Sequence, residues 1–516
     1  MHTELSRRGF QREGAGVQGE PWCPSCSGIR STHHFPAIGS KAGDSGGSLF
    51  ERIDGKRGIS PCRYGHAYHD CNSAEEIRAA GASGARDSGK FMEKKKFERD
   101  FYQLAQKCLR CGLCTMGCPV HQVEADEYTA ARGRNLLANQ INGKKDFTKQ
   151  FRQRFEKCLL CGTCLPKCPQ QIPIDLLTVS VREEMVKTKG LGLAKHFAFR
   201  YAMKDRARFG KILSWASKYQ KYLPAGEGKI RHLPAFLSAL GSGRRIPEIA
   251  PVFLRDRLPV LSSPKPEKRK GIRVGFFMGC AIDFIYPEIG QKIVRFLNGQ
   301  GVEVLIPKEQ GCCALPVIGA GDLQTAQEMA RKNLEAFGEV DLVVTGCATC
   351  GSALKDYGTF FEGEEREKQF DSFAAKVRDF SEFLFRDLKL TPVDLSSGAE
   401  RKGNLKVTYH DPCHLSRYQG IKEEPRQVIS ALPGVELIEM DGADQCCGMG
   451  GSFGLSYYDI SKKIADKKAS AIRKTGADAV VTTCPGCRMQ LVDALNRHGL
   501  PQRVLHLAEL LEPDGE

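Results

Sequence analysis

Two short segments of this chain carry the same cysteine pattern, and this pattern restricts the fold more than any other feature. The first motif, "CLRCGLCTMGCP", has cysteines at 108, 111, 114 and 118, and proline at 119. The second motif, "CLLCGTCLPKCP", repeats the spacing at 158, 161, 164 and 168, with proline at 169. Thiolates are soft metal ligands. Three thiolates at this spacing wrap one face of a compact metal group, so each motif must fold around such a group.

The complete spacing is that of bacterial ferredoxins, which bind [4Fe–4S] clusters. In that pattern the cysteine before proline ligates the other cluster. We therefore expect one cluster on Cys108, Cys111, Cys114 and Cys168, and a second on Cys158, Cys161, Cys164 and Cys118. A pair of zinc sites is the alternative, which a lone C-x-x-C would favour. Residues 119–157 exceed the minimal ferredoxin spacing, and the region resembles the helical ferredoxin domains of respiratory iron–sulfur subunits, such as that of fumarate reductase.

Residues 271–516 contain an internal repeat. "IRVGFFMGC" ending at Cys280 matches "LKVTYHDPC" ending at Cys413, and "VDLVVTGCATC" matches "ADAVVTTCPGC". We call residues 271–395 the first repeat and residues 404–516 the second repeat. Short β-branched runs alternate with segments of helical period, which predicts α/β units with largely parallel sheets. The cysteines follow the expected strands, where open α/β sheets bind their ligands.

Each repeat carries five cysteines. The first cysteine set is Cys280, Cys312, Cys313, Cys347 and Cys350, and the second cysteine set is Cys413, Cys446, Cys447, Cys484 and Cys487. A disulfide between adjacent cysteines would be strained and easily reduced. Zinc needs four ligands in a closed tetrahedron. Five thiolates at one sheet edge are better suited to a larger iron–sulfur group.

This pattern resembles the cysteine-rich CCG domain of heterodisulfide reductases. The domain occurs also in iron–sulfur subunits of glycolate oxidase, anaerobic glycerol-3-phosphate dehydrogenase and lactate-utilisation complexes. The resemblance covers residues 92–516 and implies an α+β chain, with a helical two-cluster ferredoxin domain followed by two tandem α/β CCG domains. It also implies one or two further [4Fe–4S] clusters on the two cysteine sets. The first repeat departs from the family at Ala314, where glycine is usual, and the added methyl group is expected to crowd that site.

Residues 1–91 differ in character from the rest of the chain. They are rich in Gly, Ser and Arg and lack apolar periodicity, so we expect a disordered or mis-called extension with the true start at Met92. Zinc binding by its four cysteines, Cys23, Cys26, Cys62 and Cys71, is the alternative. "SRRGF" near the N-terminus resembles a twin-arginine export signal, but no apolar stretch follows it. We therefore expect a cytoplasmic protein.

Basic residues are concentrated between the ferredoxin-like region and the repeats. The net charge of the chain is +15, and residues 190–270 contain 18 Lys/Arg but only 5 Asp/Glu. We expect a helical ferredoxin-like domain at 92–190 and a basic helical connector and linker at 191–270. Its basic face could be simply solvated, or could dock on an anionic membrane or a partner subunit. No module that stacks bases accompanies it, so nucleic-acid binding is not expected. The chain contains no run of about 18 apolar residues, so we expect no membrane-spanning helix.

Two weaker signals lie near the second cysteine set. The glycines of "CGMGGSFG" lack the dinucleotide-binding spacing, so we expect them to let the backbone approach a cluster and donate N–H groups to its sulfurs. His410 and His414 flank Cys413. They could tune a cluster or relay protons, or could serve only in packing or capping.

The chain shows no evident flavin or nicotinamide site and no catalytic triad, so no catalytic residue is expected. The family resemblance implies an oxidoreductase subunit that takes electrons from a partner flavoprotein, with FAD or FMN, that oxidises a 2-hydroxy acid such as glycolate or lactate. The acceptor would be a quinone or another membrane carrier, which implies a peripheral position on the inner face of the cytoplasmic membrane. A heterodisulfide-reductase-type subunit that reduces a disulfide is the alternative. A zinc-stabilised scaffold is a third hypothesis.

Overall fold

The computed structural model describes residues 101–141, 147–222, 230–232, 245–338, 340–361, 364–396 and 404–511. The expected extension at 1–91, with its four cysteines, lies outside the described residues. Within the described ranges, no helix is long and apolar enough to cross a membrane.

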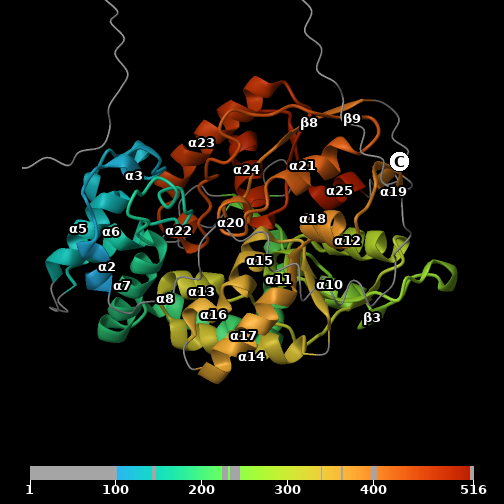
Figure 1. Ribbon diagram of the computed structural model, residues 1–516, viewed down its shortest axis with the longest axis horizontal. Helices are drawn as coiled ribbons and strands as arrows, with labels where there is room; N and C mark the ends of the chain where they lie inside the picture. The colour runs from blue at the N-terminus through green and yellow to red at the C-terminus, as the bar shows by residue number, and fades with distance from the viewer. Residues whose placement is uncertain are drawn as a thin grey trace, which may run out of the picture. The chain divides into compact units, whose positions relative to one another are not determined.

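The two motifs lie in a helical unit (Figure 1). Its elements are α2 (Phe101–Gln106), α3 (Leu113–Met116), α4 (His121–Glu124), η2 (Glu127–Thr129), α5 (Ala131–Ile141), α6 (Lys149–Glu156) and α7 (Ile174–Lys189). Thr148 caps α6 by accepting the N–H of Phe151 at 3.2 Å, a usual way to satisfy a free helix donor. Helices α2, α5, α6 and α7 bury a small apolar core around Phe155 and Leu177. The motifs are thus held by helices whose own core is separate from them.

The connector is helical in its first part and irregular afterwards. Its elements are α8 (Leu193–His196), η3 (Phe197–Met203), α9 (Arg206–Tyr219), η4 (Gln220–Tyr222), β1 (Ile230–His232), β2 (Arg245–Pro247), α10 (Leu254–Arg257), β3 (Leu261–Ser262) and η6 (Pro266–Lys268). Strands β1 and β2 pair in antiparallel fashion. Strand β3 pairs with a strand of the first repeat, so part of the expected linker forms the edge of that sheet.

The first repeat is an α/β unit. Its strands are β4 (Arg273–Phe277), β5 (Glu303–Leu305), β6 (Leu342–Thr345) and β7 (Val377–Asp379). Its helices are α11 (Gly279–Phe284), α12 (Pro287–Gly299), α13 (Leu315–Ala320), α14 (Leu323–Ala336), α15 (Ala348–Lys355), α16 (Tyr357–Phe360), α17 (Glu364–Lys376), α18 (Phe380–Glu382), η7 (Phe383–Asp387) and α19 (Pro392–Ser396). The sheet order is β3-β5-β4-β6-β7, and all pairs except β3 with β5 are parallel.

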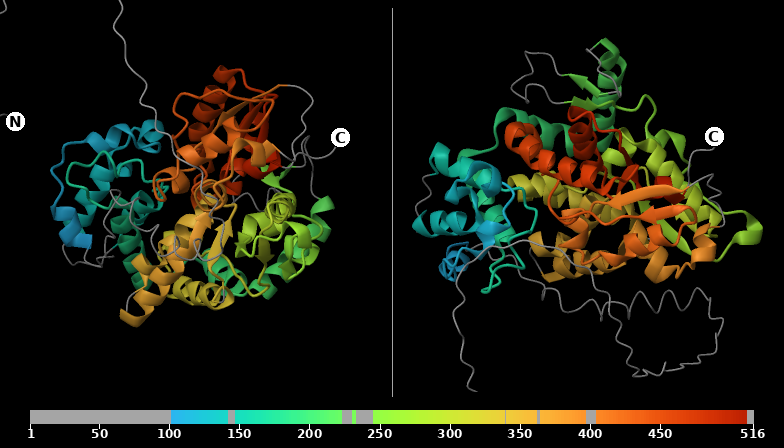
Figure 2. Two further views of the ribbon diagram at one scale, coloured as in Figure 1. Left: turned by 45° about the vertical axis from the view of Figure 1, so that its right-hand side comes forward. Right: turned by 90° about the horizontal axis from the view of Figure 1, so that it is seen from above.

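The second repeat has the same topology. Its strands are β8 (Leu405–Tyr409), β9 (Val435–Leu437), β10 (Ala479–Thr482) and β11 (Arg503–His506). Its helices are α20 (Cys413–Ser416), α21 (Glu423–Ser430), α22 (Ser452–Ser456), α23 (Tyr458–Thr475), α24 (Pro485–Arg497) and α25 (Leu507–Leu511). The order β9-β8-β10-β11 is fully parallel and matches β5-β4-β6-β7 of the first repeat. Strands β8 and β9 are visible side by side in the right-hand view of Figure 2.

This topology explains where the cysteines lie. In each repeat the first strand is flanked by the second and third strands. The segments that leave their carboxyl ends therefore meet at one edge of the sheet. Strands β4, β6 and β10 are almost entirely buried, which fits parallel strands covered on both faces. Strand β9, at the edge of its sheet, is only partly buried.

A buried charge cluster ties the connector to the first repeat. Asp283, on α11, is fully buried. Its carboxylate accepts a hydrogen bond from the Nη2 of Arg206, on α9, and another from the Nε of Arg255 at 2.9 Å. A buried carboxylate is tolerated only when it is paired in this way, so α9 is anchored against α11 at the start of the first cysteine set.

Candidate metal centres

The first motif follows α2 and includes α3. Its first three cysteines and the distant last cysteine of the second motif line one small cavity of about 20 Å³; these are Cys108, Cys111, Cys114 and Cys168. Burial raises the pKa of the Cys114 thiol, and the charges of Cys108 and Cys168 raise it further. The structure thus brings together the four cysteines that the spacing assigned to one cluster.

The second motif follows α6, and its cysteines gather around one cysteine of the first motif. Burial raises the pKa of Cys164 well above its usual range, and the charges of Cys158, Cys161 and Cys118 act in the same direction. The four sulfurs are therefore close enough for their charges to act on one another. These are the four residues that the sequence assigned to the second cluster.

The backbone of the two motifs turns in the same way. Arg110 and Gly112 in the first motif have φ of 57° and 82°, and Leu160 and Gly162 in the second have φ of 51° and 69°. Alternation between right-handed and left-handed residues turns successive N–H groups inward to form anion-binding concavities, which occur at many iron–sulfur sites. A cluster ligated by four thiolates is an anionic group, so this local geometry fits it.

Arg182, on α7, holds the second motif in place. Its guanidinium donates to the carbonyl of Phe155 at 2.6 Å, to that of Glu156 at 3.1 Å and to that of Cys158 at 2.8 Å. It also donates to the carbonyl of Gly319, on α13 of the first repeat. One buried side chain therefore fixes the start of the second motif and links it to the first repeat.

The first cysteine set lies at the carboxyl edge of the first sheet. Cys280 is in α11 after β4, Cys312 and Cys313 come between β5 and α13, and Cys347 and Cys350 begin α15 after β6. Thiol contacts run from Cys280 to Cys312, from Cys313 to Cys350 and from Cys350 to Cys347. All five sulfurs thus converge, and every residue of the set except Cys280 is buried.

Polar side chains support the loop that carries the adjacent cysteines of this set. Asn333 Nδ2 donates to the carbonyl of Cys312 at 2.9 Å and to the hydroxyl of Tyr357 at 3.1 Å. Tyr357 in turn donates to the carbonyl of Cys313 at 3.2 Å. Because the carbonyls are held from behind, the two thiols are left facing the rest of the set.

The second cysteine set repeats this arrangement at the edge of the second sheet. Cys413 begins α20 after β8, Cys446 and Cys447 lie between β9 and α22, and Cys484 and Cys487 begin α24 after β10. Thiol contacts connect Cys446 with Cys413 and Cys447 with Cys487. The contact with Cys446 lowers the pKa of Cys447 most strongly, and the contact with Cys312 does the same for Cys313. In both repeats, therefore, the first of the two adjacent cysteines lowers the pKa of the second.

The cysteine groups also contact one another. Cys347 of the first set is in thiol contact with Cys484 of the second set, and the hydroxyl of Thr349 lies 3.2 Å from the same Cys484 sulfur. Cys161 of the second motif is in thiol contact with Cys446. The second cysteine set therefore lies between the second motif and the first cysteine set.

Two residues in the turn after α20 secure the contact with the second motif. Arg417 Nη1 donates to the carbonyl of Cys161 at 3.3 Å, and the Tyr418 hydroxyl donates to the carbonyl of Leu160 at 3.1 Å. Burial lowers the pKa of Arg417, but the charges of Cys413 and Cys161 outweigh this and raise it above its usual value. The guanidinium therefore stays positively charged beside both groups of thiolates.

A cavity of about 200 Å³ opens where these groups meet. It is lined by Cys158 and Cys161 of the second motif, by Thr349, and by all five members of the second cysteine set. Its wall includes His414, whose ring stacks on that of Tyr418 with centroids 5.0 Å apart.

The donor sets fit iron–sulfur clusters. Converging thiolates repel one another, and a cationic metal group relieves that repulsion. Backbone N–H groups point at two of the sulfurs: Gly448 donates to Cys446 Sγ at 3.4 Å, and Ile172 donates to Cys168 Sγ at 3.4 Å. Such contacts commonly adjust the potential of a bound cluster. Gly448, in the glycine-rich segment, thus donates its N–H to a cysteine sulfur of the second set, and donation to a bound cluster stays a prediction.

Comparison with protein families supports this chemistry. The 4Fe-4S dicluster domain family matches residues 104–172, and the cysteine-rich CCG domain family matches residues 274–355 and 407–492. Lactate utilization protein A of Geobacillus thermodenitrificans is 34% identical over 241 residues, which are 46% of this chain and 98% of that protein. This chain belongs to the CCG-domain iron–sulfur protein family.

Two further relatives match this chain over different lengths. The probable glycolate oxidase iron–sulfur subunit of Bacillus subtilis is 29% identical over 420 residues, covering 78% of this chain and 92% of that protein. A fumarate reductase (CoM/CoB) subunit of Methanothermobacter marburgensis is 39% identical over 247 residues, but the match spans 47% of this chain and only 46% of that protein. The expected order of a dicluster domain and two CCG domains, carrying several [4Fe–4S] clusters, is confirmed.

Several residues that shape the centres were not anticipated from the sequence. Arg417 lies four residues after Cys413, on the same helical stretch, and this spacing could have indicated it. Arg182 and Asn333 carry no local signal, because their roles depend on contacts with segments far along the chain.

Ala314 and Gly448 occupy matching positions after the adjacent cysteines. Both are left-handed, with φ of 63° and 92°. A Cβ added to Gly448 would lie 2.7 Å from the carbonyl oxygen of Ser461 and 3.1 Å from the Cβ of Ile464, both on α23. In the second repeat, therefore, the nearest atoms that a methyl group would meet belong to a helix and not to a cysteine.

We predict that Gly448→Ala lowers the free energy of unfolding of the metal-loaded protein by about 2 kcal/mol or more, because left-handed strain and the clash with Ser461 add together. Denaturant unfolding followed by circular dichroism under anaerobic conditions measures it. Gly476→Ala is the matched control, since Gly476 has φ of 66° but open space around it, and should lose only about 1 kcal/mol. If both variants lose the same free energy of unfolding, α23 accommodates the added methyl group and the predicted clash is absent.

Proposed function

We propose that this protein is the iron–sulfur electron-transfer subunit of a flavin-dependent 2-hydroxy acid dehydrogenase, with glycolate or lactate as substrate of a partner flavoprotein. The chain would pass electrons from that flavoprotein to a quinone or another membrane carrier. The observation that carries the proposal is the series of thiol contacts from Cys161 through the second cysteine set to Cys347 of the first, around one shared cavity. The names of the Bacillus and Geobacillus relatives favour the glycolate or lactate type.

In this proposal four groups of cysteines are ligands. They are Cys108, Cys111, Cys114 and Cys168; Cys158, Cys161, Cys164 and Cys118; and the first and second cysteine sets. When bound, [4Fe–4S] clusters supply one-electron transfer at potentials set by burial and hydrogen bonds.

The side chains around these ligands position them and exclude water. Arg182 and Arg417 bridge the second motif to the two repeats through backbone carbonyls. Thr349 spans the junction of the two cysteine sets. Because these bridges are buried or half-buried, the thiols of neighbouring groups are kept at contact distance in a low-dielectric interior.

The function is tested with a flavin-dependent 2-hydroxy acid dehydrogenase from the same organism. The two proteins are purified together anaerobically, glycolate or lactate is added, and bleaching of the visible iron–sulfur absorbance is followed. We expect bleaching that requires both the flavoprotein and the hydroxy acid, while this chain alone is reduced only by dithionite. A metal content of zinc in place of iron, or no bleaching with any 2-hydroxy acid, would contradict the proposal.

Disulfide reduction at the CCG domains is a second candidate. It is favoured by the 200 Å³ cavity beside the second cysteine set and by the fumarate reductase (CoM/CoB) relative. To test it, the protein is reduced with dithionite and the excess reductant is removed. A disulfide substrate should then reoxidise the protein, taking up two electrons and two protons to give two thiols. Reoxidation by a quinone analogue, and none by disulfides, would favour the electron-transfer function.

The exchange of ligands between the two motifs makes a specific prediction. Cys118→Ser, in the first motif, should abolish the EPR signal of the cluster held by the second motif, because Cys118 lies among Cys158, Cys161 and Cys164. Cys168→Ser should abolish the other signal, because Cys168 lines the cavity with Cys108, Cys111 and Cys114. If each variant affects the cluster of its own motif, the assignment is wrong.

We also propose that the connector contacts an anionic membrane surface, which would bring the protein to the inner face of the cytoplasmic membrane. Lys211, Trp215, Tyr219 and Tyr222 follow one face of α9 and η4, and Lys218 adjoins them; all five are exposed. The rings of Trp215 and Tyr219 lie 4.6 Å apart. Aromatic rings beside lysines are typical of segments at the lipid headgroup level.

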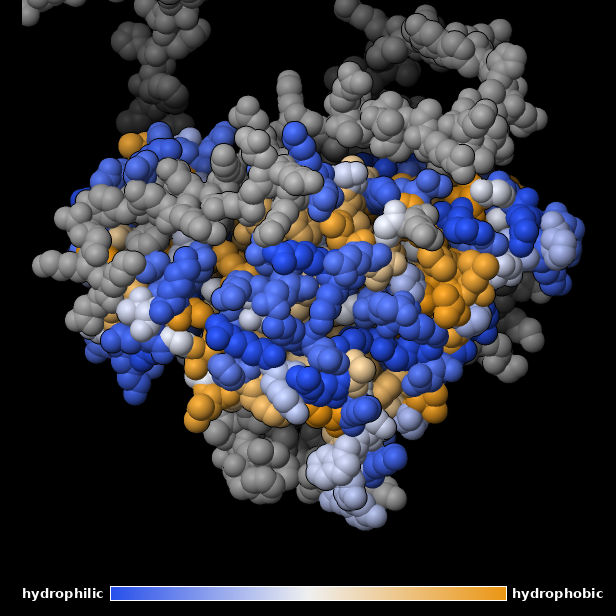
Figure 3. All heavy atoms as spheres, turned by 90° about the horizontal axis from the view of Figure 1, so that it is seen from below, coloured by the Kyte–Doolittle hydropathy of each residue, from blue (hydrophilic) through white to orange (hydrophobic). Residues whose placement is uncertain are grey.

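Figure 3 shows a face on which hydrophilic side chains predominate and hydrophobic patches are separate. In the right-hand view of Figure 2, the green segment that includes α9 lies at one margin of the described part.

We predict that Lys218→Gln weakens binding to phosphatidylglycerol vesicles about fivefold, since one lysine near an anionic surface contributes about 1 kcal/mol. Co-sedimentation at low and high salt measures it. The control is Lys368→Gln, because Lys368 is an exposed lysine on α17 and should leave binding unchanged. Equal effects of the two variants, or binding to neutral vesicles that salt does not change, would contradict docking through α9.

A further inference from the structure

His410 lies at the carboxyl edge of the second sheet, directly after β8. Its backbone N–H donates to the carbonyl of Val481, on β10, at 2.9 Å. The side chain is fully buried, with 0% of its surface exposed. Cys413 follows three residues later, so the imidazole and the second cysteine set share one edge of one sheet.

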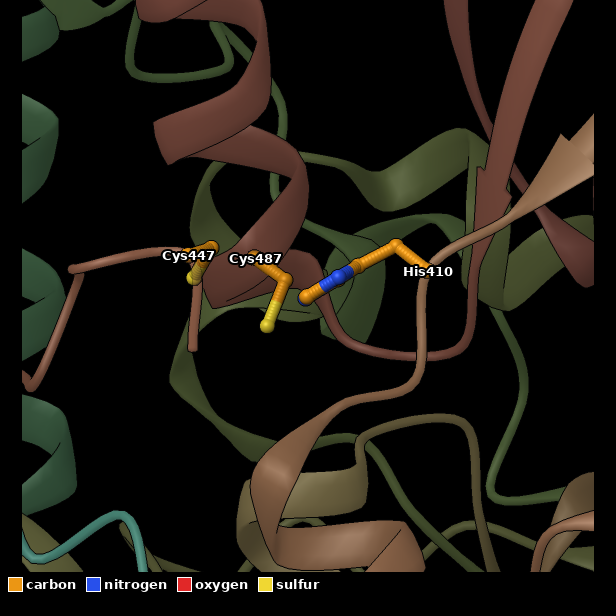
Figure 4. A group of neighbouring side chains, drawn as sticks. All are labelled: His410, Cys447 and Cys487. Carbon is orange, nitrogen blue, oxygen red and sulfur yellow. The ribbon is translucent and has the colours of Figure 1, made fainter. Parts of the chain in front are cut away.

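The ring of His410 points toward two sulfurs of that set. A ring nitrogen of His410, Cys447 Sγ and Cys487 Sγ all lie within 4.8 Å of one another. Figure 4 shows the ring directed toward the two cysteines. Among the described residues, neither ring nitrogen has a hydrogen-bond partner. A buried N–H without an acceptor costs about 1–3 kcal/mol, so the position implies an acceptor on the cysteine side.

Two other buried or half-buried histidines near the cysteine sets are already engaged. His506 Nε2 lies 2.8 Å from the carbonyl oxygen of Gly346. The ring of His414 stacks on that of Tyr418. His410 differs from both, because its polar neighbours are sulfurs.

The first repeat has no counterpart to this imidazole. The aligned segments "IRVGFFMGC" and "LKVTYHDPC" place Phe277 opposite His410. Phe277 is fully buried at the end of β4 and packs against Phe337 with ring centroids 5.8 Å apart. The same position of the fold is therefore apolar beside the first cysteine set and polar beside the second.

Unlike the imidazole, a guanidinium group is present near each of the two cysteine sets. Arg206 lies near Cys280, and Arg417 lies near Cys413. Lys468 adds a further cation near the second set, where it donates to the carbonyl of Ala443 at 3.2 Å. A test of the imidazole must therefore change His410 alone and leave these cations in place.

We propose that His410 donates a ring N–H to a sulfur of Cys447 or Cys487, and so makes the cluster of the second cysteine set easier to reduce than that of the first. The proposal rests on the function above, in which both sets hold clusters. An N–H dipole aimed at a ligand sulfur stabilises the extra negative charge of the reduced state. Five thiolates already supply the ligands of the set, so the imidazole is a positioning and tuning group.

The test is a redox titration of the full-length, cluster-loaded protein followed by EPR. The signal of the second set is identified as the one lost in Cys447→Ser. In His410→Phe, which reproduces the residue of the first repeat, we expect the ratio of reduced to oxidised second-set cluster at a fixed potential to fall about tenfold. That ratio corresponds to a midpoint lower by about 59 mV for one electron. His410→Gln retains an N–H donor and should recover part of the loss.

A second readout identifies the contact directly. ENDOR spectra of the second-set signal should show an exchangeable proton in the wild type that is absent in His410→Phe. The control is His498→Gln, because His498 is an exposed histidine paired with Asp466, and it should change neither the potential nor the spectrum.

Three results would overturn the inference. One is a second-set signal whose potential and proton coupling are unchanged in His410→Phe. Another is a strong nitrogen coupling, which would make His410 an iron ligand and not a donor to sulfur. The third is a wild type without any signal that depends on Cys447, and this result alone would also overturn the proposed role of the second cysteine set.

Discussion

The convergence of thiolates at the carboxyl ends of parallel strands is the constraint on which the rest of the structure depends. Five sulfurs can approach one another only where several strands release the chain at the same edge. The second and third strands of each repeat flank the first for this reason, and short segments carry the cysteines from all three. The accumulated negative charge is offset by buried or half-buried cations such as Arg206 and Arg417, and by N–H groups such as that of Gly448.

The two repeats share a topology but not a chemistry. Their strand orders correspond element by element, and their cysteines follow the same strands. Beside the sulfurs the repeats differ at Phe277 and His410, and at Ala314 and Gly448, which follow the adjacent cysteines. The two repeats thus share their strand order, while the side chains around their two cysteine sets differ.

Much of this could be predicted from the sequence, because the decisive signals are local. Cysteine spacing alone grouped Cys168 with the first motif and Cys118 with the second, and short β-branched runs located the strands of both repeats. What could not be predicted depends on distant contacts. Arg417 donates to a carbonyl 256 residues away in the sequence, and strand β3 joins a sheet whose other members begin later in the chain. Neither periodicity nor spacing encodes such pairings. The sequence indicated His410 as a neighbour of Cys413. Only the structure shows that, among the described residues, its ring nitrogens have no hydrogen-bond partner.

The contact between Cys161 and Cys446 has a consequence for how the protein is made. Ribosomes synthesise the two motifs long before the second cysteine set, and domains generally fold in that order. The helical unit can therefore receive its metal while the repeats are still absent. The second cysteine set is complete only after Cys487 has emerged, and by then the second motif already forms part of its wall. The order of the cysteines along the chain therefore makes the second cysteine set the last of the four groups to be completed.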